Sequence, residues 1–74
     1  MREDLKNLEK LLLSLSEETQ KDIGPRTYIS TVTGEIGDDE LNFWGNYEPD
    51  NLKDQQTVEE IYELAKKIYE EAQK

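Results

Sequence analysis

Neither cysteine nor histidine occurs in this 74-residue chain, so no disulfide and no zinc site of the usual cysteine and histidine type can hold the fold together. A chain of this length makes one domain, which buries only about 60 to 65% of its unfolded surface. The sequence is 34% hydrophobic and 36% charged, a balance that favours disorder unless the apolar residues are patterned. The spacing of those residues is therefore the main constraint on the fold.

The N-terminal third carries apolar side chains at three- and four-residue steps, which indicates an amphipathic helix over about residues 3–23. The positions on this stripe are Leu5, Leu8, Leu11, Leu12, Leu15, Thr19 and Ile23. Gly24-Pro25 ends the predicted helix, because glycine accepts the left-handed conformation and proline cannot continue a helix. Ser14 and Ser16 leave an alternative open, since either serine can cap a new helix and so break the first one.

A second amphipathic helix is predicted over about residues 57–73. Thr57 and Glu60 have the spacing of a capping box, with Thr57 as the N-cap. The apolar stripe consists of Val58, Ile61, Leu64, Ala65, Ile68 and Ala72. This segment resembles the idealised amphipathic helices of designed proteins, which combine a capping box with Glu, Lys and Ala at the remaining positions.

Residues 26–48 are rich in Thr, Tyr, Ile, Val and Trp, which favour strands, and Gly37-Asp38-Asp39 is typical of a turn. The segment therefore predicts an antiparallel hairpin. A loop of two or four residues places most large apolar side chains on one face, whereas a three-residue loop mixes the two faces. The face predicted to pack under both helices carries Tyr28, Val32, Ile36, Leu41, Phe43 and Tyr47.

The predicted architecture is an α+β domain spanning residues 1–74: helix, hairpin, helix (αββα), with both helices on one face of a two-stranded sheet. Residues 49–56 form a polar crossover to the last helix. Ile29 and Trp44 are expected on the other face of the hairpin, and tryptophan is the residue most enriched at binding hot spots. Because both strands are edges, a homodimer through the hairpin edge or the Trp44 face is an alternative to a monomer.

Acidic residues are concentrated in one part of the chain. The formal net charge is −9, and residues 35–63 hold ten acids against the single base Lys53. Some of this charge has a simpler explanation, because acids near a helix start interact favourably with its dipole and surface acids aid solubility. The candidate partner-binding acids are Glu35, Asp38, Asp39, Glu40, Glu48, Asp50, Asp54, Glu59, Glu60 and Glu63.

Catalytic chemistry is poorly represented. Without histidine or cysteine the commonest bases, nucleophiles and soft metal ligands are missing. The Asp38-Asp39-Glu40 run and the Asp50, Asn51 and Asp54 group supply oxygen ligands of the kind that calcium and magnesium use, but their spacing does not fit an EF-hand loop. We therefore expect no enzyme activity, no metal site and no cofactor, with carboxylate-based metal chemistry as a distant third hypothesis.

The leading functional prediction is a small acidic protein-interaction module that occupies a basic, nucleic-acid-binding surface of a partner, such as a nuclease or DNA-binding protein. In composition the chain resembles the small acidic inhibitors that phages use against nucleases, some of which mimic DNA charge. The second hypothesis is a designed or redesigned scaffold with no natural partner.

The same composition bears on the surroundings of the chain. The net charge of −9 argues against direct binding to nucleic acid or to an anionic membrane. No apolar run approaches the length of a membrane span, and Leu11-Leu12-Leu13 follows acids and lysines, unlike the apolar core of a signal peptide. We expect a cytoplasmic protein.

Overall fold

The structure, a computed structural model that describes residues 2–73, consists of four α-helices: α1 (Arg2–Leu13), α2 (Glu17–Val32), α3 (Asp38–Asn46) and α4 (Leu52–Ala72). No strand occurs within residues 2–73. The predicted α+β fold is therefore wrong, and with it the hairpin over residues 26–48 and any dimer through a hairpin edge. Residues 26–32 belong to α2, and most of the predicted second strand is α3.

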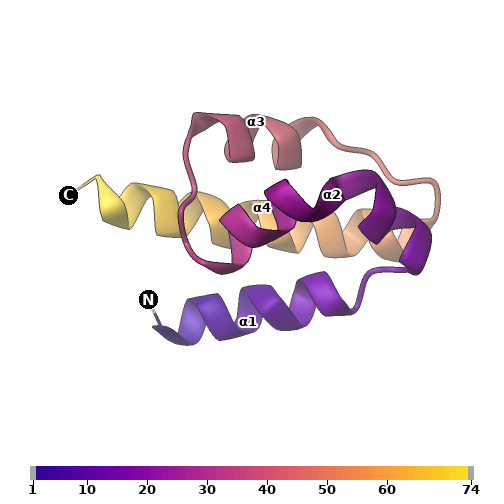
Figure 1. Cartoon of the computed structure of the whole chain (residues 1–74), viewed down its shortest axis with the longest axis horizontal. Helices are drawn as coiled ribbons and strands as arrows, with labels where there is room; N and C mark the ends of the chain where they lie inside the picture. The colour runs from indigo at the N-terminus through magenta and orange to yellow at the C-terminus, as the bar shows by residue number, and fades with distance from the viewer. Residues whose placement is uncertain (1, 74) are drawn as a thin grey trace.

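The helices are arranged so that each packs on its neighbours around one core. α4 contacts α1 on one side and α3 on the other, and α2 contacts both α1 and α3. Figure 1 shows α1 and α3 on opposite sides of α4, with the two termini toward the same end of the molecule. The buried apolar side chains at the centre are Leu8, Leu12, Leu15, Ile23, Ile36, Trp44, Val58, Ile61, Ala65 and Ile68.

The segment after Gly24 was predicted as a strand, but its burial has the period of a helix. Thr31 is fully buried, and Thr27, Tyr28 and Val32 are half-buried, which is the three- and four-residue spacing of one helix face. Threonine is tolerated here because its hydroxyl bonds back to the preceding turn: Thr31 Oγ1 donates to the Thr27 carbonyl at 2.7 Å. Tertiary packing has overridden the strand propensity of this segment.

The acidic run Asp38-Asp39-Glu40, which was predicted to lie in the hairpin turn, instead begins α3. Asp38, Asp39 and Glu40 occupy the first turn of this helix, where negative charge interacts favourably with the helix dipole. Glu40 also reaches back, and its Oε1 accepts a hydrogen bond of 2.8 Å from the Gly37 N–H. The side chains predicted for the core face of the hairpin do meet the core, but from helices and the loops beside them: Ile36 is buried, and Tyr28, Val32, Leu41, Phe43 and Tyr47 pack against the cluster.

The single helix predicted over residues 3–23 is interrupted, as the serine alternative anticipated. α1 ends at Leu13, and Ser16 caps α2 with its side chain accepting from the Thr19 N–H. A second break lies inside α2, where Gly24 has φ +80° and ψ 159° and the helix continues from Pro25. Proline fits the first turn of a helix because its missing N–H has no partner there.

The last helix begins earlier than predicted. Its N-cap is Asn51, whose Oδ1 accepts from the Asp54 N–H at 2.8 Å. The prediction of Thr57 as the N-cap is wrong, because Thr57 lies within α4 and its hydroxyl donates to the Lys53 carbonyl at 3.1 Å. Residues 52–56, predicted to be part of the crossover over 49–56, therefore belong to the first turns of α4.

Candidate functional site

Asp54 forms the centre of a buried polar cluster between the starts of α2 and α4. The Asp54 carboxylate is 2% exposed. Its Oδ2 accepts hydrogen bonds of 2.6 Å from Ser16 Oγ, 2.6 Å from Thr19 Oγ1 and 2.9 Å from Asn51 Nδ2. The Ser16 N–H also points at this carboxylate, at 3.3 Å, so a negative charge sits at the positive end of α2.

This cluster holds Asp54 in its ionised form. Burial by itself would raise the pKa of Asp54, but the hydrogen bonds from Ser16, Thr19 and Asn51 outweigh it and lower the pKa to about 2. The charge is compensated inside the fold and turned away from solvent. Asp54, although predicted as part of a partner-facing patch, is therefore a group that joins two helices.

Trp44 also differs from the sequence-based expectation. Its side chain is 2% exposed, and its indole N–H donates to Thr31 Oγ1 at 3.0 Å. Phe43 meets the indole edge-to-face with ring centroids 5.1 Å apart. Ile29, expected beside Trp44 on an open sheet face, lies on α2 with 58% of its surface exposed. Trp44 thus anchors α3 in the core and offers no side chain to a partner in this conformation.

The acids around α3 remain on the surface. Glu35, Asp38, Asp39, Glu48 and Asp50 are all exposed, whereas Glu40 is half-buried. Residues 35–50, which we call the acidic edge, contain no lysine or arginine. Asp38 accepts a hydrogen bond of 2.7 Å from the Tyr69 hydroxyl, and this bond raises the pKa of Tyr69.

The remaining predicted acids lie on the outer side of α4. Glu59, Glu60 and Glu63 are exposed and alternate with the buried positions of the helix. Bases are found on α1, α2 and α4, at Arg2, Lys6, Lys10, Lys21, Arg26, Lys53, Lys66 and Lys67. The fold therefore separates an edge with acids only from surfaces of mixed charge.

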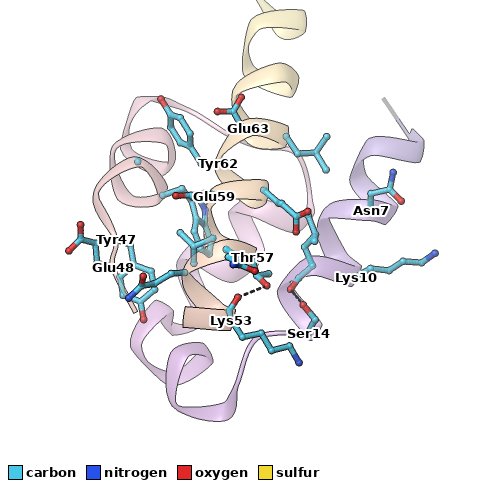
Figure 2. A pocket seen from close by; sticks show the side chains of 18 of the residues that line it. Asn7, Lys10, Ser14, Tyr47, Glu48, Lys53, Thr57, Glu59, Tyr62 and Glu63 are labelled. Carbon is cyan, nitrogen blue, oxygen red and sulfur yellow. Dashed lines mark hydrogen bonds between the residues drawn. The ribbon is translucent and has the colours of Figure 1, made fainter. Parts of the chain in front are cut away.

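A broad, open hollow of about 1450 Å³ runs over α4 between α1 and α3. Figure 2 shows Tyr47, Glu48 and Tyr62 on its α3 side, and Asn7, Lys10 and Ser14 on its α1 side. The α1 side carries compensated charge, since Lys67 Nζ lies 3.4 Å from the Asp4 carboxylate. We call the other half, lined by Gly45, Tyr47, Glu48, Glu59 and Tyr62, the α3–α4 valley.

Sequence reasoning did not single out Tyr62 as a functional residue. In the structure this half-buried side chain lies against Gly45, where an added β-carbon would come within 3.1 Å of the Tyr62 ring. The position of Tyr62 on the helix, beside both the apolar Val58 and the exposed Glu59, could have identified it as a residue at the edge of the core. The valley itself follows only once α3 is placed beside α4.

Other kinds of site find little support in the described part of the chain. No group of three or more Asp or Glu side chains within residues 2–73 could hold a metal ion. None of the described helices is long and apolar enough to cross a membrane. Comparisons with protein-family models, curated proteins and solved structures gave no significant match to this chain.

Proposed function

We propose that this protein is an acidic binding module that docks the acidic edge onto a basic surface of a partner protein. The observation that carries the proposal is the charge of residues 35–50, which hold six acids and no base, five of them exposed on one short helix and its two loops. Such a one-signed field attracts a basic partner over several ångströms and repels acidic ones.

The kind of partner follows from the same charge. Nucleic acid and anionic lipid share the sign of the acidic edge and are repelled by it. Proteins that bind nucleic acid expose clustered lysine and arginine, so their binding surfaces are the best complement. The proposed role is to occupy such a surface in competition with nucleic acid, and the cytoplasm is the proposed compartment.

A fluorescent lysine-rich peptide is a suitable probe, with its affinity measured by anisotropy at several salt concentrations. The test variant Asp39→Asn/Glu48→Gln/Asp50→Asn removes three exposed charges from the acidic edge. We expect this variant to bind the peptide more weakly than the parent and to show a shallower dependence of affinity on salt, because fewer charges are screened.

The matched control is Glu3→Gln/Glu9→Gln/Glu18→Gln, which removes three exposed charges from α1 and α2. The two triple variants have the same net charge as each other, because each loses three carboxylates. Weak binding confined to the acidic-edge variant supports docking there. Equal losses in the two variants would show that only the overall charge matters and would overturn the proposal.

A further inference from the structure

We infer that the α3–α4 valley selects arginine over lysine in the docked segment of the partner. This inference rests on the proposed function and adds the chemistry of the residue that is recognised. The hollow of about 1450 Å³ is open and exceeds the roughly 300 to 1,000 Å³ of a small-molecule pocket. Its size suits a stretch of polypeptide rather than a small molecule.

The valley combines an aromatic wall with carboxylates. Tyr62 is half-buried against Gly45, and the exposed carboxylates of Glu48 and Glu59 line the same valley. In Figure 2 the Tyr62 ring projects from α4 toward the α3 side, where Tyr47 and Glu48 also lie. The hydroxyls of Tyr47 and Tyr69 are engaged with Asp22 and Asp38, whereas among the described residues no hydrogen bond holds the Tyr62 hydroxyl.

This combination distinguishes the two basic side chains. A guanidinium is planar, stacks on an aromatic ring and binds a carboxylate through two parallel hydrogen bonds, whereas an ammonium is a compact and strongly hydrated charge. The acidic edge attracts both side chains equally through its field. Both side chains can interact with the ring of Tyr62, but arginine gains more, because its guanidinium stacks flat on the ring and pairs with Glu48 or Glu59 through two hydrogen bonds.

The absence of a side chain at Gly45 is what opens the valley beside this ring. A β-carbon there would stand 3.1 Å from Tyr62 Cε1 and 3.6 Å from its Cζ, so any larger residue would push the ring or cover it. Lys53 and Lys10 line the far side of the same hollow, toward α1. A cationic side chain is therefore directed toward the α3 side of the hollow.

The experiment compares two fluorescent peptides of equal length, one rich in arginine and one rich in lysine. The parent protein should bind the arginine peptide about five- to tenfold more tightly, because the guanidinium combines stacking on the Tyr62 ring with paired hydrogen bonds to a carboxylate. Tyr62→Leu should reduce this preference to near unity, and Tyr62→Phe should retain it because the ring remains. The matched control is Tyr28→Leu, which replaces a half-buried tyrosine on α2, and this variant should keep the full preference for the arginine peptide.

The outcomes separate this inference from the proposed function. If the parent binds both peptides equally, or if Tyr62→Leu keeps the preference for arginine, the inference that the valley selects arginine is wrong. Docking by the acidic edge still stands in that case, provided that the acidic-edge variant binds both peptides more weakly. If the acidic-edge variant weakens neither peptide, the proposed function itself fails. If circular dichroism shows that Tyr62→Leu does not fold, NMR of the parent provides the test instead. Addition of the arginine peptide should then shift the ring-proton resonances of Tyr62 more than those of Tyr28. Absent shifts would overturn the inference.

Discussion

A single carboxylate illustrates how strongly one residue can depend on its surroundings in this protein. Asp54 belongs to the acid-rich part of the sequence, yet it is buried and accepts bonds from three side chains of two helix starts. Charge-assisted bonds of this kind contribute about 1.5 to 3 kcal/mol each, and an unpaired buried charge is costly. The pairing of Asp54 with Ser16 and Thr19 is therefore one of the contacts that define where α2 starts.

The depressed pKa of Asp54 makes a pH-dependent prediction. Because the folded pKa is about 2 and the unfolded value is about 3.9, the stabilising contribution is complete above about pH 4 and is lost as the pH falls toward 2. Asp54→Asn should thus lower the free energy of unfolding by about 1.5 to 3 kcal/mol at neutral pH. The difference from the parent, measured by urea unfolding, should shrink through that window.

Asp39→Asn provides the control for this measurement, because Asp39 is exposed on α3. Its effect on the urea midpoint should be small at neutral pH and at low pH. A gap between Asp54→Asn and the parent that stays constant with pH would mean that Asp54 is not the group whose ionisation the network stabilises.

At the scale of the helices, the break within α2 decides which side chains this element buries. Gly24 has φ +80° and ψ 159°, a region that is essentially restricted to glycine. The turn before it buries Thr19 and Ile23, and the turns after it bury Thr31. A continuous helix would carry the second set away from the core, so the break lets one element present two faces inward.

Gly24→Ala tests this break through the sign of its effect. No atom lies within 4 Å of the added β-carbon, so backbone strain alone should destabilise the protein by about 1 to 3 kcal/mol. In an unbroken helix the same substitution would instead stabilise by about 0.5 to 1 kcal/mol, because alanine is the better helix former. A thermal or urea midpoint above that of the parent would contradict the break.

At the scale of the whole molecule, the dominant long-range force is self-repulsion. The chain has 18 acids against nine bases, and within residues 2–73 only Lys67 and Asp4 form an ion pair closer than 4 Å. A net charge this far from zero destabilises the folded state, because folding brings the like charges together. The acidic edge and the outer side of α4 contribute most to this repulsion.

Salt should therefore stabilise the fold. Raising sodium chloride from about 0.01 M to about 0.15 M shortens the screening length from roughly 30 Å to roughly 8 Å, and the urea midpoint should rise. Urea is the required denaturant, because guanidinium is itself a salt. The increase should be smaller for Asp39→Asn/Glu48→Gln/Asp50→Asn than for the parent. A midpoint that falls with salt would mean that attractive pairs outweigh the repulsion.

The sequence alone determined the features that arise from local periodicity and from composition. Leu8 and Leu12 in α1, and Ile61, Ala65 and Ile68 in α4, are buried as their spacing predicts. The concentration of acids in residues 35–63 was likewise readable without a structure, as was the alternative that Ser14–Ser16 interrupts the first helix. Each of these follows from residues within a few turns of one another.

Only the tertiary structure decided the fate of the middle of the chain. Residues 26–32 are rich in strand-forming side chains, and their helical state depends on packing of α2 against α1 and α3, which includes the contact of Thr31 with Trp44. The acidic triplet at 38–40 fits a turn as well as a helix start, and the burial of Trp44 against Thr31 is what secures α3. Contacts between residues far apart in sequence determined which local conformation this segment adopts. The resulting packing buries Asp54 and Trp44 and places Tyr62 in the α3–α4 valley.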